Sequence, residues 1–375
     1  MHVSFRSRPL IALNTGCLIF VVVTGCGSPK ADEAKEVVAA EAIASTQGAP
    51  ATLQEKIDAA LDYTFYDREL NTIDHGAWQV LHGALAYQRQ FPVRVGRTES
   101  TPSAINYLLN GGTVDGWQFR PGQRLQNGRI GLRAVMQPGT KRGQGHADQW
   151  LAILAQCEFP VDKEIIAGGR KYTIADLISQ VQLDVSDNVE NEYSWTLIGF
   201  ALYLDPNTKW IANDGDEWSI PRLIEIELQQ DLDDSACGGT HRLIGVTMAL
   251  NEYKKRGGES TGVWATVETR IQNAIRIAQQ TQNDDGSFSP NYFARPGQTV
   301  DTATRLATTG HILEFLSLAM SKGELEADWV KKAAGHLSEL FLDTEEISLE
   351  CGALYHAAHG LALYRDKVYG KRTYK

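Results

Sequence analysis

An acidic cluster followed by a cysteine and a histidine stands in the middle of the chain. The stretch QDLDDSACGGTHRL holds Asp231, Asp233 and Asp234 ahead of Cys237 and His241. Neighbouring carboxylates raise each other's pKa, so one of them can stay protonated and act as a general acid. Acids at a helix start also interact favourably with its positive end, so the same residues fit a helix cap. The sequence leaves both interpretations open.

Polar and aromatic residues stand near the starts of six apolar segments that carry little charge. The segments are residues 80–91, 143–157, 191–204, 238–253, 308–323 and 355–366. One such residue in each segment marks a corresponding position of the repeat, and successive marker residues lie 46 to 70 residues apart. This spacing is typical of a repeat of two helices with insertions. The marker residues are His82, His146, Trp195, His241, His311 and His359.

Six amphipathic segments alternate with the apolar ones and carry apolar residues three and four positions apart, as helices that face water do. They are residues 53–67, 103–110, 173–185, 217–232, 263–282 and 327–343. This alternation predicts an all-α fold, an α/α toroid of six helical hairpins (twelve helices), with an open solenoid of hairpins as the alternative. Two insertions near residues 111–145 and 164–174 predict short strands or ordered loops.

Parallel inner helices would bring their N-terminal ends to one mouth of the toroid. Helix N-termini carry unpaired N–H groups and partial positive charge, so this mouth is the default binding site. A histidine there also fits a satisfied core or capping residue. The expected substrate-binding residues are His82, His146, Tyr193, Trp195, His241, His356 and His359. The candidate catalytic residues are Asp231, Asp233, Asp234 and His311.

The predicted ring of hairpins, together with QNDDGSF (282–288), resembles the terpenoid cyclase and prenyltransferase superfamily. The stretch DLDDSA (231–236) resembles the acid motif of squalene–hopene cyclases, which ends in Thr-Ala. The resemblance implies that Asp233 protonates an alkene and that a histidine, here His311, polarises this acid. Those cyclases pair two toroids and repeat the Gln/Gly/aromatic motif, whereas this chain has length for one toroid and holds one copy.

The prenyltransferase branch binds zinc through an Asp, a Cys and a His, and ALYHAAHGLAL resembles the segment with that histidine, which would be His356. Gly-x-Thr replaces its Asp-x-Cys pair here, so that zinc site is not carried over, and we assign no metal and no cofactor. Cys237 with His241, and His356 with His359, stay candidate ligands of a different site, because residues three or four apart share a helix face. ACGGTH and AHG also resemble lanthionine cyclase motifs.

The N-terminal residues predict that the protein is located in the cell envelope. Residues 1–25 combine two arginines, a short apolar run and a small pair before Cys26, as in a lipoprotein signal peptide. The pattern resembles a bacterial lipobox, in which the cysteine is diacylated with chains such as palmitate and anchors the protein to a membrane. Residues 26–51 are then expected to form a flexible tether. No aspartate follows Cys26, which favours sorting to the outer membrane.

The remaining residues, 52–370, are expected to form one domain. Because the signal peptide holds two arginines and no acid, its removal changes the formal net charge from −10 to −12, which argues against nucleic acid as a partner. Three cysteines follow Cys26, so at least one is free or metal-bound.

Two classes of function remain open. One is an enzyme at the mouth, terpenoid-cyclase-like or polysaccharide-active, with a small-molecule, isoprenoid or glycan ligand. The other is a non-catalytic, membrane-tethered binding or scaffold module of the cell envelope. A deep pocket containing Asp233 or a histidine pair would favour the enzyme, and a ring plugged by side chains would favour the scaffold.

Overall fold

Helices make up most of the chain that the computed structural model describes, residues 52–136, 145–188 and 192–374. This confirms the all-α class. None of the helices in these residues is both long enough and apolar enough to cross a bilayer. The predicted signal peptide, Cys26 and the tether to residue 51 lie outside the described residues.

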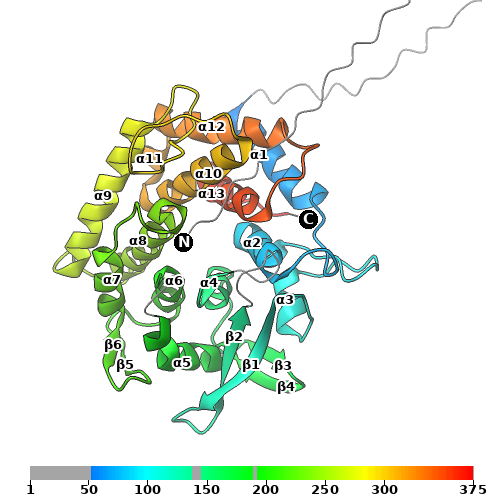
Figure 1. The fold of residues 1–375 in the computed structure, drawn as a ribbon, viewed down its shortest axis with the longest axis vertical. Coiled ribbons are helices and arrows are strands. Elements are labelled where there is room, and N and C mark those ends of the chain that lie inside the picture. Colours follow the sequence, from blue (N-terminus) through cyan, green and yellow to red (C-terminus); the bar gives the residue numbers. More distant parts are fainter. Residues whose placement is uncertain (1–51, 137–144, 189–191, 375) are drawn as a thin grey trace, which may run out of the picture. The chain divides into compact units, whose positions relative to one another are not determined.

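Six helices contact one another in a closed cycle, each touching the next and the last touching the first. Figure 1 shows them grouped inside the other helices. Their sequences are the predicted apolar segments, shifted by a few residues at the ends. They are α2 (Ala77–Tyr87), α4 (Gln149–Gln156), α6 (Ser194–Tyr203), α8 (Thr240–Lys255), α10 (Thr302–Ala319) and α13 (Cys351–Tyr369).

Six further helices of the described residues pack outside this set, each against one or two inner helices. Their apolar residues face inward and their charges face water, as the spacing of apolar residues predicts. They are α1 (Leu53–Asp62), α3 (Ala104–Leu109), α5 (Ile174–Asp184), α7 (Ile220–Gln229), α9 (Val263–Thr281) and α12 (Asp328–Leu342). A short helix, α11 (Lys322–Leu325), precedes α12, and a π-helical turn (Tyr63–Asp67) extends α1.

Three two-stranded antiparallel hairpins interrupt the helices. The pairs are β1 (Trp117–Arg124) with β2 (Ile130–Met136), β3 (Glu164–Ala167) with β4 (Arg170–Thr173), and β5 (Lys209–Ile211) with β6 (Glu217–Ser219). The first two confirm the strands predicted in the insertions.

The third hairpin corrects the predicted helix at 217–232. Residues 217–219 form β6 and pair with β5, so α7 begins only at Ile220, where the Ser219 hydroxyl caps it by accepting from the Arg222 N–H. The turn between β5 and β6 contains Gly215 at φ 83°, a conformation that suits glycine. The dipeptide Asp214-Gly215 was the sequence signal for this turn.

Two glycines let α10 and α13 approach until their backbones touch. A Cβ placed on Gly310 would lie 2.6 Å from the Ala357 Cα, and one on Gly360 would lie 2.9 Å from the Glu314 nitrogen. Protein interiors are close-packed, so no side chain fits at either point. The close approach sets Glu314 beside the buried face of α13.

We expect Gly310→Ala to lower the free energy of unfolding by about 1–3 kcal/mol, because the added methyl group meets backbone that cannot move independently. Gly323→Ala is the matched control. A Cβ there meets nothing within 4 Å, so this variant should match or slightly exceed the wild type in stability. Denaturant titration measures both, and equal stability of the two variants would contradict the close approach.

Candidate functional site

Six histidines from the inner helices gather at the centre of the cycle. Five of the rings are linked by centroid distances of 4.0 to 5.4 Å, and His359 joins them through Glu314, which it shares with His356. All except His146 are at most 4% exposed. The cluster consists of His82 (α2), His146 (just before α4), His241 (α8), His311 (α10), and His356 and His359 (α13). The structure thus brings together the six histidines that the sequence placed at one mouth.

Backbone carbonyls orient two of these rings. His82 Nδ1 lies 2.5 Å from the Trp78 carbonyl, and His311 Nδ1 lies 2.7 Å from the Ala307 carbonyl, one helical turn back in each case. A carbonyl only accepts, so Nδ1 must carry the proton. In the neutral ring, Nε2 therefore keeps its lone pair and faces away from the helix backbone.

Two buried glutamates orient the other four rings. Glu192 Oε1 lies 2.8 Å from His146 Nδ1 and 2.9 Å from His241 Nδ1. Glu314 lies 2.8 Å from His356 Nδ1 and 2.7 Å from His359 Nδ1. In each of the six rings, Nδ1 thus faces a carbonyl or carboxylate oxygen that accepts its hydrogen bond.

Neither glutamate was among the site residues predicted from the sequence. The available signal was an acid inside, or just before, an otherwise apolar segment: Glu314 is the acid of TTGHILEFLSLA, and Glu192 precedes YSWTLIGF. Acids are rarely fully buried without partners. An acid in such a segment therefore indicates a buried hydrogen-bonded site.

The histidines keep both carboxylates ionised. Burial alone would raise the pKa of Glu192 and of Glu314, but the imidazoles bound to each lower it below the ordinary value. Burial and the neighbouring His311 keep the pKa of His356 well below its usual range. His356 is therefore a neutral ring that donates to a carboxylate, and the contact is a hydrogen bond rather than an ion pair.

Cys237 reaches the cluster through an unusual backbone. Cys237, Gly238 and Gly239 have φ of 50°, 58° and 72° in succession, and α8 begins directly after them. Left-handed backbone is costly for a residue with a Cβ, so this conformation is imposed on the cysteine. The cysteine does not share a helix face with His241. The left-handed turn, rather than helical spacing, brings the two side chains together.

The Cys237 sulfur, one nitrogen of His241 and one of His311 lie within 4.8 Å of one another. Burial alone would raise the pKa of the thiol, but His311 and His241 lower it to about 5. Burial also disfavours the charged form of His241, but Glu192 and Cys237 raise its pKa well above the ordinary value. In the metal-free protein, a thiolate therefore faces a protonated imidazole.

The Nε2 atoms of His241 and His311 are buried and have no oxygen or nitrogen partner, and the Cys237 sulfur is the acceptor beside both rings. A buried polar atom without a partner costs free energy unless a ligand satisfies it. Two imidazole nitrogens and one thiolate form a donor set typical of zinc, whose bonds to such ligands are about 2.0–2.3 Å long. The residues present thus fit a transition metal.

Two predicted binding residues have different surroundings. The Trp195 ring lies 5.6 Å from the ring of His146 and 5.3 Å from that of His241, so it forms one wall of the cluster. The Tyr193 hydroxyl instead donates to the Val185 carbonyl at 3.0 Å in the core, away from the histidines.

The three aspartates of the acidic stretch lie at the surface. Asp231 accepts from the backbone N–H of Asp233 at 3.3 Å, and the structure shows none of the three in contact with the described histidine cluster. They do not cap the helix either, since the N-cap of α8 is Gly239 and no side chain bonds to it. The capping interpretation is therefore wrong for α8.

The QNDDGSF motif joins α9 to α12. Gln282 Nε2 donates to the Trp329 carbonyl at 2.8 Å and to the Gly286 carbonyl at 3.0 Å. Gly286 has φ 91°, and a Cβ on it would lie 2.4 Å from the Lys332 carbonyl oxygen. The motif acts as a turn that holds two outer helices together.

Comparison of this chain with protein family models, with curated proteins and with solved structures found no match.

The pH dependence of stability tests the burial of His82. Burial lowers its pKa from 6.5 to about 3, so below pH 6.5 the unfolded chain binds a proton that the folded chain does not. The stability that His82 contributes is present above pH 6.5 and is lost as the pH falls. We expect the difference in unfolding free energy between wild type and His82→Gln to fall by about 2 kcal/mol between pH 7 and pH 5. A difference that stays constant would contradict a neutral, buried His82.

Proposed function

We propose that this protein is an exported, lipid-anchored α/α toroid of the cell envelope, and that its mouth holds a catalytic transition-metal centre, most naturally zinc. The closed cycle of contacts from α2 to α13 supports the toroid, because an open solenoid has no contact between its first and last repeats. The packing of an outer helix against every inner helix supports six hairpins.

One observation carries the metal centre: the Cys237 sulfur and one nitrogen each of His241 and His311 lie within 4.8 Å of one another, and the buried Nε2 atoms of both rings have no oxygen or nitrogen partner. Hydrogen bonding of Nδ1 to a carboxylate or a carbonyl is the usual way in which proteins orient a metal-binding imidazole. Glu192 does this for His241, and the Ala307 carbonyl does it for His311.

Three protein ligands favour an enzyme over a structural site. Structural zinc sites are closed by four protein ligands, whereas catalytic sites keep one position open for water or substrate. A metal there would act as a Lewis acid on a substrate oxygen or lower the pKa of water. Cys237, His241 and His311 would hold the ion, and Glu192 would position His241.

The geometry does not favour a terpenoid cyclase that works through Asp233. An acid that protonates an alkene has to be kept neutral by a dry or like-charged environment. Asp231, Asp233 and Asp234 are exposed to water. We therefore propose a small molecule that reaches the mouth as the substrate of this centre, and not an alkene protonated by Asp233.

A thiol enzyme is the second candidate, and the Cys237 pKa of about 5 favours it. Cys237, His241 and Glu192 stand in the order of a nucleophile, a base and an orienting acid. This arrangement needs no metal, so metal content separates the two candidates.

We expect the purified chain to contain about one equivalent of zinc or another transition metal, and Cys237→Ser and His311→Gln each to lose it. Elemental analysis measures the content. The matched control is Cys157→Ala, since Cys157 is buried in the apolar core and should leave the metal in place.

The rate at which iodoacetamide alkylates Cys237 distinguishes a metal-bound thiolate from a free one. A metal-bound thiolate should resist iodoacetamide until a chelator is added. Metal-free protein whose Cys237 reacts rapidly at pH 6 would reject the metal centre in favour of the thiol enzyme. Metal retained in Cys237→Ser would place the ion elsewhere.

The lipid anchor has its own test. We expect radiolabelled palmitate to be incorporated into the wild-type chain and not into Cys26→Ala, and the wild type to sediment with membranes. Cys26→Ala should retain the metal content of the wild type, since Cys237, His241 and His311 hold the proposed ion. Membrane sedimentation of an unlabelled wild-type chain would contradict lipidation.

A further inference from the structure

A cavity of about 250 Å³ lies between β2, α4 and α5. Four buried apolar side chains form much of its wall, namely Leu132 of β2, Leu151 of α4, and Leu177 and Val181 of α5. The cavity opens to solvent along β2, where residues 133–136 are half-buried. The described residues of its lining include none of the three proposed metal ligands.

Three charged side chains line this cavity, and their charges do not cancel. They are Arg133, Asp148 and Asp184. Arg133 donates to both oxygens of Asp184, from Nε at 2.6 Å and from Nη2 at 2.8 Å. Gln180 Nε2 also donates to Asp184, at 2.9 Å, so this carboxylate is fully engaged. Asp148 is thus left without a cationic partner among the described residues.

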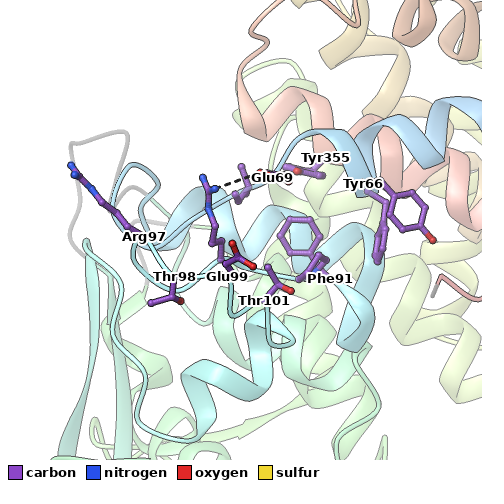
Figure 2. Close-up of a pocket in the computed structure, with 12 residues that line it drawn as sticks. Tyr66, Glu69, Phe91, Arg97, Thr98, Glu99, Thr101 and Tyr355 are labelled. Carbon is purple, nitrogen blue, oxygen red and sulfur yellow. Dashed lines mark ion pairs between the residues drawn. The ribbon is translucent and has the colours of Figure 1, made fainter.

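The larger cavity shown in Figure 2 lies at the junction of the first and last helical hairpins and differs in this respect. Its described charged residues are two acids and two arginines, namely Glu69, Glu99, Arg94 and Arg97. Arg94 Nη1 lies 3.7 Å from the Glu69 carboxylate. Because these charges balance, that cavity has no net charge with which to select an ion, whereas the cavity beside β2 has an unbalanced acid.

The carboxylate of Asp148 keeps one oxygen available to a ligand. Asp148 precedes α4 with a left-handed φ of 60°, which aspartate tolerates better than most residues, and its side chain makes no capping bond to the helix. The Thr196 hydroxyl donates to Oδ2 at 2.5 Å. Oδ1 has no hydrogen bond within the described residues, and Asp148 is a half-buried residue of the cavity lining. Oδ1 is therefore an accessible acceptor without a donor.

The ionised form of Asp148 is costly unless a cation joins it. Burial raises the pKa of Asp148 to about 6, and Asp184 adds to this rise, while the hydrogen bond from Thr196 opposes it. Above this pH the folded chain holds a charge that burial disfavours. A cation bound at Oδ1 would balance that charge and satisfy the free oxygen.

The apolar wall selects the kind of cation. An ion such as Ca²⁺ requires about six to eight oxygen ligands, and the lining offers Asp148 Oδ1 as its free carboxylate oxygen. An ammonium group on a short alkyl chain instead donates to that oxygen and places its carbons against Leu132, Leu151 and Leu177. At about 30 Å³ for each water-sized atom, the cavity has room for roughly eight of them. A small alkylammonium therefore matches the size, the charge and the wall.

We propose that this cavity binds a small primary alkylammonium, with its N–H groups on Asp148 Oδ1 and its alkyl chain against the apolar wall. The ligand supplies the positive charge that the lining lacks, and burial of the chain removes apolar surface from water. Hydrogen bonds between charged groups are stronger than neutral ones, so charge as well as shape selects the ligand.

Calorimetric titration of the full chain at about pH 8 with n-butylammonium, and with the neutral 1-butanol, tests the proposal. We expect butylammonium to bind at least about tenfold more tightly than butanol, because charged hydrogen bonds contribute more than neutral ones. Asp148→Asn keeps the shape and an acceptor for Thr196 but removes the charge. This variant should raise the Kd for butylammonium about tenfold and abolish the preference over butanol.

Three control measurements exclude other causes of that loss. Asp148→Asn removes a buried charge without a cation, so the unliganded variant should melt no lower than the wild type. Asp187→Asn removes the same charge from an exposed residue outside the cavity lining, and should change the Kd less than twofold. Ala134→Leu enlarges a half-buried side chain of the lining, and should weaken the binding of both ligands.

Four outcomes would overturn the proposal. They are the absence of saturable butylammonium binding, equal binding of butanol, and equal losses in Asp187→Asn and Asp148→Asn, which would reduce the effect to general surface charge. The fourth is displacement of butylammonium by an equal concentration of potassium ions, which would make the cavity a site for inorganic cations.

Discussion

The interior of this protein depends on two buried carboxylates, each of which accepts hydrogen bonds from two imidazoles. An ionised glutamate in a helical core costs several kcal/mol unless its oxygens accept hydrogen bonds. Glu192 meets that requirement by joining the segment before α6 to the starts of α4 and α8. Glu314 meets it by joining α10 to α13. The carboxylates thus connect two groups of inner helices, and Cys237 lies where the groups meet.

The apolar packing around the cluster determines its geometry. Gly310 and Gly360 allow α10 and α13 into backbone contact, which places the rings of His311 and His356 4.0 Å apart. The left-handed residues before α8 then direct Cys237 toward His311 instead of into solvent. Tight helix packing and a strained turn therefore position the reactive groups, and the loop from Asp231 to Asp234 is left at the surface.

The sequence predicted the helices well because the apolar period depends only on local spacing. It also placed the six histidines at one mouth, since each stands at a similar position in its repeat. It could not show that Glu192 and Glu314 bind those rings, because that depends on which helices are neighbours. The third residue of the Cys237 and His241 group, His311, comes from α10, and local spacing does not show that these helices meet. The acidic stretch was predicted as a site, but its aspartates are solvated by water. The strands β5 and β6 were missed because tertiary pairing outweighed the amphipathic pattern of residues 217–232.

The junction between the first and last hairpins also bears on how the chain acquires its structure. Lys56 pairs with Glu339, and Arg68 bonds to the Leu349 carbonyl, across about 280 positions of sequence. Contacts of such long range slow folding, because the closing of a large loop precedes any gain from them. During synthesis α1 emerges first, while the helices that cover it emerge last. Its apolar face therefore stays exposed until α12 and α13 have been synthesised, and the chain reaches that point with one of its helices still lacking the partners that bury it.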